Sequence, residues 1–324
     1  MRALVTGATG QDGVILSSML AARGVETVGL VKPGASVDQL VSYAPDVTVV
    51  EVDLDDPDSL HSVVQEIDPT HLWNFGGFTA PGESWDRAAE VERINVDAVS
   101  AIIAALVSQA SGARLFQASS ATVFEGSDRS PQTESTELTP ESPYAQSKAR
   151  SMELVREARS ASGLFACSGI FYNHESPLRG ENFVTRKVSM AVARISAGLA
   201  DTLELGDVEV ARDWGWAPDY VRATMLILEA DSPKDYVLAT GISHRLSFFV
   251  QKAFAAAGIS HWQDHVVSTA SNTRVGDTNL MVGDSRAAYL DLGWRHTVDF
   301  DSMAAIMVAH DIALLSDPSA VWKI

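Results

Sequence analysis

A tyrosine and a lysine four positions apart offer the clearest chemistry in this sequence. Tyr144 and Lys148 lie in the segment 142–148, which begins Ser-Pro and is predicted to open a helix. At this spacing both side chains lie on one helical face. A phenol has a pKa of about 10 and is a poor base at neutral pH. A lysine ammonium one turn away stabilises the phenolate. The pair therefore predicts proton transfer to or from a hydroxyl or ketone.

Two hydroxyl residues follow the expected strand 114–118. In the conventional strand order of an α/β sheet this strand end lies beside the helix of Tyr144. Ser120 is then expected to share the hydrogen bond to the reacting oxygen of a sugar or ketone. Thr122 stands two positions further on and brings a neutral hydroxyl, which is a poor base. We take Ser120, Thr122, Tyr144 and Lys148 as the candidate catalytic positions.

A glycine-rich loop begins at residue 7, directly after the first expected strand and before the first expected helix. Its glycines permit a sharp turn and let the backbone approach a pyrophosphate, while the helix N-terminus presents unpaired N–H groups to the phosphates. The loop predicts a dinucleotide site. The residues expected to contact the dinucleotide here are Gly7, Thr9, Gly10, Gln11, Asp12 and Gly13. Tyr144 and Lys148 are expected to contact the cofactor as well.

Other strand ends predict further cofactor contacts. Asp53 and Leu54 end the third strand, where a carboxylate can accept from an adenine amine. Phe75 and Gly76 end the fourth, where a small residue leaves room for the cofactor. The second strand ends at Lys32 without an acid for a ribose 2′-hydroxyl, and a lysine can meet a 2′-phosphate instead. This favours NADP, with NAD as the alternative.

Short β-branched runs alternate with amphipathic stretches through the first two thirds of the chain, which predicts a doubly wound parallel sheet of the Rossmann type. After residue 173 strand and helix patterns no longer alternate regularly, which indicates a smaller mixed α/β C-terminal domain. We expect residues 1–172 to form the NAD(P)-binding domain and 173–324 mainly the second domain, with part of 208–245 returning to the sheet. The expected strands are 3–5, 27–30, 47–52, 71–75, 114–118, 165–171 and 235–240, and the expected helices 14–23, 58–67, 88–108 and 144–160.

Composition excludes several classes of function. The 324 residues carry 42 acidic against 24 basic side chains, a net charge of −18, which disfavours nucleic acid and anionic membranes as partners. The single cysteine, Cys167, excludes an internal disulfide, and the histidines are scattered, so we expect no metal site. No targeting or membrane-spanning segment is visible, so we expect a cytoplasmic protein.

Together these motifs resemble the extended short-chain dehydrogenase/reductases that modify nucleotide sugars. The segment 173–187, which reads Asn-His-Glu-Ser-Pro-Leu-Arg-Gly-Glu-Asn-Phe-Val-Thr-Arg-Lys, resembles the signature of the GDP-mannose 4,6-dehydratases. The likeness extends over nearly the whole chain. Further blocks similar to that family are 212–215, 219–221, 239–241, 283–285 and 292–294.

The resemblance implies a fold, a ligand and a set of contacts. It implies NAD(P)-dependent chemistry at C4 of a GDP-hexose, and a homo-oligomer, either dimer or tetramer. Arginines make physical sense here, because an acidic protein that binds a pyrophosphate needs fixed guanidinium groups. The substrate-binding residues implied by the resemblance are Ser84, Asn173, Val184, Arg186, Lys187, Arg212, Arg274 and Asp277.

One position departs from the family pattern. In the family a glutamate two residues after the catalytic Ser/Thr acts in removing water, and here that position is Thr122. Another carboxylate, Glu83 or Glu125, could replace it. Alternatively the protein is a GDP-hexose 4-epimerase or a 4-keto-6-deoxy-sugar reductase, since 119–123 resembles UDP-galactose 4-epimerases. A third reading is a non-catalytic cofactor-binding relative, against which the complete Ser120, Tyr144 and Lys148 set argues. We place GDP-mannose 4,6-dehydration first.

Overall fold

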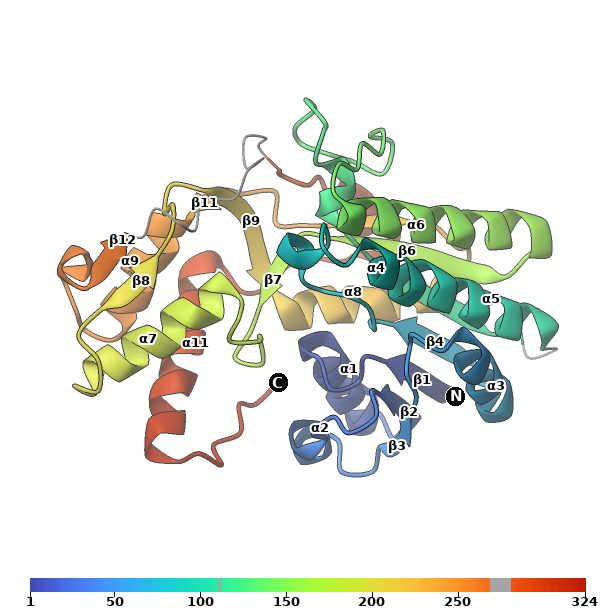
Figure 1. Cartoon of the computed structure of the whole chain (residues 1–324), viewed down its shortest axis with the longest axis horizontal. Coiled ribbons are helices and arrows are strands. Elements are labelled where there is room, and N and C mark those ends of the chain that lie inside the picture. The colour runs from blue at the N-terminus through green and yellow to red at the C-terminus, as the bar shows by residue number, and fades with distance from the viewer. Residues whose placement is uncertain (110–111, 269–280) are drawn as a thin grey trace.

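A seven-stranded parallel sheet forms the centre of the larger part of the molecule (Figure 1). The computed structural model describes residues 1–109, 112–268 and 281–324. Along the sheet the strand order is β10-β6-β5-β4-β1-β2-β3. The strands are β1 (Arg2–Thr6), β2 (Glu26–Val31), β3 (Thr48–Glu51), β4 (His71–Asn74), β5 (Arg114–Ser120), β6 (Phe165–Phe171) and β10 (Tyr236–Leu238). The expected Rossmann-type fold class is confirmed.

Helices cover both faces of this sheet, which is why its strands consist of nearly continuous apolar runs. On one face α1, α2 and α8 pack together, and on the other α3, α5 and α6. Each face has its own apolar core: Val14 and Phe116 belong to one cluster, and Leu72 and Ile102 to the other. The helices are α1 (Gln11–Ala22), α2 (Asp38–Tyr43), α3 (Pro57–Ile67), α4 (Ala88–Glu92), α5 (Ala98–Ser108), α6 (Pro143–Ser162), α8 (Ala217–Glu229) and α10 (Arg286–Leu292).

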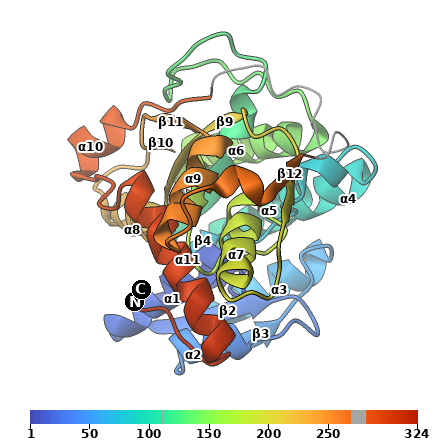
Figure 2. The same cartoon turned by 90° about the vertical axis from the view of Figure 1, so that its left-hand side faces the viewer.

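A second, smaller unit lies at the left of Figure 1 and faces the viewer in Figure 2. Its three-stranded sheet has the order β11-β9-β7, and helices cover it around a core that contains Trp214, Phe249 and Phe300. These elements are β7 (Asn173–Glu175), β9 (Ala211–Trp216), β11 (Ser243–Arg245), α7 (Val184–Ser196), α9 (Leu246–Ala256) and α11 (Phe300–Ser316). A two-stranded ribbon of β8 (Leu203–Leu205) and β12 (Val266–Ser268) lies at its outer edge.

Two details of the fold differ from what hydrophobic periodicity predicts. The expected helix 88–108 contains a π-helical segment, η2 (Arg93–Asp97), between α4 and α5. A π-bulge inserts one residue into the turn, and an amphipathic pattern does not reveal it. The pattern also does not predict the short helix α2, because its six residues bury only Leu40.

The late strand β10 pairs with β6 at the sheet edge, with Val237 opposite Ile170.

Candidate active site

The glycine loop is built so that only glycine fits at its two ends. Gly7 has φ +63°, and a Cβ there would lie 2.7 Å from the backbone nitrogen of Gly76. A Cβ on Gly13 would lie 2.3 Å from the carbonyl oxygen of Gly7. Helix α1 begins at Gln11, directly after Gly10 at its N-cap. A backbone cradle that opens on a helix N-terminus fits a dinucleotide pyrophosphate.

Polar side chains tie together the three strand ends around this loop. The Thr6 hydroxyl donates to Asn74 Oδ1 and accepts from the Gly76 N–H at 2.9 Å. Asn74 Nδ2 then donates to Gln117 Oε1 at 2.7 Å. A Cβ on Gly76 would also lie 2.6 Å from Leu54 Cδ1. The structure thus brings Leu54 and Gly76 beside the glycine loop.

The structure brings Ser120, Tyr144 and Lys148 together at the carboxyl end of β5. Ser120 is the last residue of β5, and its side chain lies close enough to Tyr144, in the first turn of α6, to lower the pKa of the phenol. Lys148 Nζ donates to the Ala118 carbonyl at 3.2 Å and lies 5.8 Å from the centroid of the Tyr144 ring. Tyr144 and Lys148 are both buried. This arrangement can hold an oxygen atom and move its proton.

Burial and the neighbouring groups act in opposite directions on the pKa of Tyr144. Burial raises the pKa of Tyr144, and the neighbouring Ser120 side chain and the positive charge of Arg179 work against that increase. Burial lowers the pKa of Lys148 to about 8. A lysine with that pKa is close to exchanging its proton near neutral pH, which suits a group that serves proton transfer.

Arg179 is a site residue that the sequence does not single out. Its Nε lies 3.2 Å from Glu175 Oε2, and its guanidinium lies 3.6 Å from the centroid of the Phe183 ring. Its positive charge reaches both Tyr144 and Asp12. Arg179 is one of two arginines in the segment 173–187, and no local pattern marks it, since the contact depends on how β7 packs against the main sheet.

Asn95 is a second residue that sequence reasoning missed. It lies in the π-helical segment η2, and its Oδ1 accepts the Phe78 N–H at 2.8 Å while its Nδ2 donates to Ser147 Oγ at 2.9 Å. Ser147 immediately precedes Lys148 in α6. Asn95 therefore fixes the first turns of α6 to α5 and to the loop after β4.

Gln11 and Asp12 use their side chains to hold β7. The Asp12 carboxylate accepts from His174 Nε2 at 3.0 and 3.1 Å, and His174 Nδ1 faces the Tyr172 carbonyl at 2.8 Å. Gln11 Nε2 donates to the His174 carbonyl at 3.1 Å. Burial would lower the pKa of His174, but the Asp12 carboxylate outweighs burial and raises it. Burial would raise the pKa of Asp12, and His174 holds it below its usual value.

This pair predicts a pH-dependent contribution to stability. Since the folded pKa of His174 is raised, its contribution is complete below the unfolded pKa and is lost as pH rises through the folded pKa. For Asp12, whose pKa is lowered, the contribution is lost as pH falls through the folded pKa. In His174→Gln, the loss in unfolding free energy should therefore be largest near about pH 5 to 6 and smaller at about pH 9.

Denaturant unfolding across this pH range measures the effect. His61→Gln is the control, because His61 Nδ1 faces only the Ala101 carbonyl at 3.3 Å. A loss in His174→Gln that stays constant with pH would contradict a charged His174–Asp12 pair.

Thr122 and the two alternative carboxylates have distinct surroundings. The Thr122 N–H donates to Ser120 Oγ at 3.3 Å, whereas its own Oγ1 is buried without a hydrogen-bond partner among the described residues. Glu83 lies in η1 (Pro81–Glu83), is exposed, and pairs with Arg87 at 2.8 Å. Glu125 accepts the Ser142 N–H at 3.0 Å, at the start of the helix that carries Tyr144. Of the two carboxylates, Glu125 is the one whose charge acts on Tyr144.

The residues implied as substrate contacts fall into two groups. Asn173 lies half-buried on β7, in register with Trp214 of β9, and Arg212 lies half-buried on β9. Val184 and Lys187 lie in the first turn of α7, where Lys187 is exposed. These four belong to the smaller unit, on the two strands and the helix that follow β6.

Ser84 and Arg186 are buried in other contacts. Ser84 is fully buried and donates to the Pro81 carbonyl at 2.7 Å. Arg186 forms a buried ion pair with Asp311 of α11, so its charge is engaged within the smaller unit. Burial raises the pKa of Asp311 to about 6, against the pull of Arg186. The expected contacts Arg274 and Asp277 lie outside the described residues.

The remaining cofactor positions are at the rim. Thr9 is half-buried, and Lys32 is exposed just after β2. Phe75 is half-buried and packs edge-on against Phe116, with ring centroids 5.8 Å apart. Asp53 Oδ1 accepts the Asp55 N–H at 3.0 Å, so one of its oxygens serves the turn after β3.

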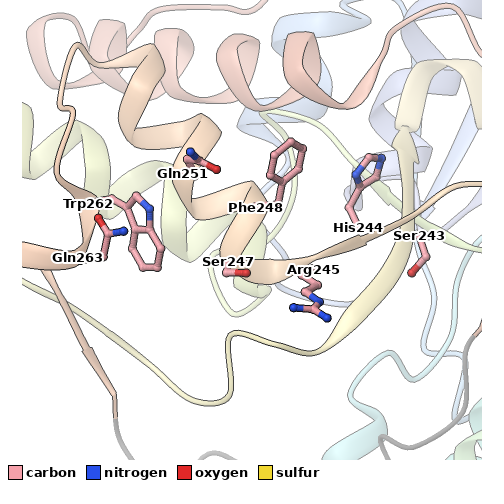
Figure 3. Close-up of a pocket in the computed structure, with 8 residues that line it drawn as sticks. All are labelled: Ser243, His244, Arg245, Ser247, Phe248, Gln251, Trp262 and Gln263. Atoms are coloured by element: carbon pink, nitrogen blue, oxygen red, sulfur yellow. The ribbon is translucent and has the colours of Figure 1, made fainter.

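A cavity of about 410 Å³ lies in the smaller unit, between β11, α9 and η4 (Trp262–Asp264) (Figure 3). Phe248 and Trp262 line it, together with His244, which lies opposite Arg212 in the β11–β9 pairing. A second cavity of about 300 Å³ shares His244. Tyr144, Lys148 and Ser120 line neither cavity.

Two features are absent from the described part of the chain. Within 1–109, 112–268 and 281–324, no group of three or more His, Cys, Asp or Glu side chains is arranged to hold a metal ion. In the same residues, no helix combines the length and apolar character needed to cross a membrane.

Comparison with known proteins gives a consistent result. The model of the GDP-mannose 4,6 dehydratase family matches residues 4–307. GDP-mannose 4,6 dehydratase 1 of Arabidopsis thaliana is 36% identical, over 96% of this chain and 90% of that protein. The GDP-mannose 4,6 dehydratase of Homo sapiens is 33% identical, over 98% of this chain and 93% of its own length.

Solved structures confirm the fold. The UDP-glucose 4-epimerase of Thermus thermophilus, in complex with NAD, superposes with a TM-score of 0.83 at 24% identity, over 96% of this chain and 99% of that one. RMD from Pseudomonas aeruginosa, complexed with NADPH, superposes with a TM-score of 0.80 at 21% identity, over 97% of this chain and 99% of that one.

Proposed function

The chain belongs to the GDP-mannose 4,6-dehydratase family, and from that premise we propose that it is an NAD(P)-dependent enzyme that acts at C4 of GDP-mannose and removes water to leave a 4-keto-6-deoxy sugar. The observation that carries this proposal is the meeting of Ser120, Tyr144 and Lys148 at the strand ends beside a dinucleotide-type glycine loop. A family match over residues 4–307 supports the GDP-hexose as the ligand.

Each side chain has a defined part in the first step. A nicotinamide held beside the glycine loop would supply the hydride chemistry at C4. Tyr144 takes the proton from the C4 hydroxyl, and Ser120 holds the same oxygen by a hydrogen bond. Lys148, buried one helical turn away, stabilises the phenolate. Burial of Tyr144 and Lys148 keeps water from the oxygen during the transfer.

The second step needs a group that removes the C5 proton and protonates the C6 hydroxyl. At Thr122 the sequence places a neutral hydroxyl, whose Oγ1 is buried without a partner in the described part of the chain. That observation favours a second candidate function, C4 epimerisation of a GDP-hexose, in which no elimination occurs. Incubation of the protein with GDP-mannose and catalytic NADP, followed by mass spectrometry, separates the two. Dehydration gives a product lighter by one water, and epimerisation leaves the mass unchanged.

We propose NADP as the cofactor, because Lys32 lies exposed after β2, where a 2′-phosphate would bind. In Lys32→Ala the affinity for NADP should fall by about tenfold, while that for NAD stays nearly constant, since only NADP carries the extra phosphate. Isothermal titration of both cofactors measures this. Lys234→Ala, which removes a lysine paired with Asp291, is the control. Equal losses for NADP and NAD in Lys32→Ala would remove the argument.

The two units have separate roles in this proposal. Residues 1–172 bind the cofactor, with part of 208–245 returning through β10 to the sheet, and residues 173–324 mainly bind the GDP-sugar. The proposal includes Asn173, Val184, Lys187 and Arg212 on the sugar-nucleotide side. It also includes assembly into a dimer or tetramer, which sedimentation of the purified protein measures.

A further inference from the structure

A carboxylate binds the N-cap residue of the helix that carries Tyr144. Glu125 Oε2 accepts two hydrogen bonds from Ser142, one from its N–H at 3.0 Å and one from its hydroxyl at 3.0 Å. Ser142 is the N-cap of α6, and its Oγ accepts the Ala145 N–H at 3.2 Å. The hydrogen bonds therefore run from Glu125 through Ser142 to Ala145, which follows Tyr144 in the first turn of α6.

The segment 120–125 ends at Glu125 and begins at Ser120, which lies beside Tyr144. Ser120, whose side chain lowers the pKa of Tyr144, is followed by the single turn η3 (Ala121–Phe124), and Glu125 comes next. Backbone bonds hold this turn: Glu125 N–H donates to the Thr122 carbonyl at 3.0 Å, and Gly126 N–H to the Thr139 carbonyl at 2.9 Å. One compact segment thus fixes both the hydroxyl of Tyr144 and the start of its helix.

Tyr144 is surrounded by groups of both signs and by apolar side chains. Arg179 follows β7, and Lys148 lies on α6 itself. Phe78, after β4, and Val91, of α4, pack with the tyrosine ring and bring no charge. Burial raises the pKa of Tyr144, and the negative charge of Glu125 adds to the increase, whereas Ser120 and Arg179 oppose it.

We propose that Glu125 is a positioning residue for proton transfer by Tyr144: its carboxylate fixes the first turn of α6 to the Ser120 segment and holds a negative charge beside the phenol. The inference rests on the proposed function only in taking Tyr144 as the group that transfers the proton. The inference also assigns a role to Glu125 in a site where Thr122, at the position of the family's glutamate, carries no charge.

Glu125→Gln tests this inference, because glutamine keeps an oxygen that accepts from the Ser142 N–H but removes the charge. Turnover of GDP-mannose should fall by about tenfold, since the cap that orients Tyr144 is weakened. The acidic limb of the pH profile of kcat/KM should move to lower pH, because loss of a neighbouring negative charge favours the phenolate. A residue with a merely structural role would lower the rate without moving the profile.

Glu153→Gln is the matched control. It removes the same charge from the exposed side of the same helix, where Glu153 pairs with Arg150 at 3.0 Å. Its profile should coincide with that of the wild-type protein. Identical profiles in wild type, Glu125→Gln and Glu153→Gln would overturn the inference.

A second readout does not depend on turnover. The ionisation of Tyr144 can be followed by phenolate absorbance, as the difference from a Tyr144→Phe protein. Its midpoint should lie at lower pH in Glu125→Gln than in wild type. If this shift occurs and GDP-mannose is not converted, the proposed function fails and the inference holds. If GDP-mannose is converted and the midpoint does not move, the inference fails alone.

Discussion

Replacement of Tyr144 by phenylalanine is expected to lower kcat for GDP-mannose by about three orders of magnitude, because no other described group at the end of β5 can take the proton of the C4 hydroxyl as directly. The phenol lies near Ser120 and within one helical turn of Lys148, whose buried Nζ donates to the Ala118 carbonyl at 3.2 Å. The ring itself stays in place in the variant, packed against Phe78 and Val91.

Cofactor binding should survive this substitution. The glycine loop follows β1, and the Thr6–Asn74–Gln117 network joins β1, β4 and β5, so neither contains the lost hydroxyl. Steady-state kinetics and isothermal titration of NADP measure the two effects separately. Tyr289→Phe, an exposed tyrosine on α10, serves as the control and should retain full activity. Full activity in Tyr144→Phe would contradict the catalytic assignment.

Replacement of Gly13 by alanine is expected to lower the free energy of unfolding by about 3 kcal/mol and to abolish measurable cofactor binding. The new Cβ would lie 2.3 Å from the Gly7 carbonyl oxygen and 2.6 Å from the Ala8 Cα, and both are backbone atoms. Backbone atoms cannot rotate away as a side chain does, so α1 has to shift from β1. That shift moves the N–H groups on which the phosphates depend.

Chemical denaturation and NADP titration check this prediction. Gly82→Ala is the matched control, because nothing lies within 4 Å of a Cβ placed there. It should change stability by less than about 0.5 kcal/mol. A Gly13→Ala protein that binds NADP as tightly as wild type would show that the loop does not form the pyrophosphate cradle.

The parts of the site that are local in sequence could be predicted. Gly7, Gly10 and Gly13 indicate the loop because the turn and the helix start lie within one short segment. Tyr144 and Lys148 are also recognisable, since their relation is fixed by one helical turn. The alternation of strands and helices predicts the parallel sheet for the same reason, because each period is a property of one short segment.

Contacts between distant segments could not be predicted. Asp12 and His174 are separated by 162 residues, and the carboxylate meets the imidazole only because β7 packs against the start of α1. Asn95 owes its role to a π-helical segment that leaves the apolar pattern unchanged. The family resemblance implies that Arg186 contacts the substrate, yet the packing of α7 against α11 places it beside Asp311.

The most direct test of the central claim uses GDP-mannose labelled with deuterium at C4, incubated with the protein and catalytic NADP. If the protein removes the C4 hydride and completes dehydration, the product is lighter by one water and carries the deuterium at C6, as mass spectrometry and NMR will show. Recovery of a C4 epimer with unchanged mass would contradict dehydration and support the second candidate function. Recovery of unaltered GDP-mannose would contradict chemistry at C4 of this substrate.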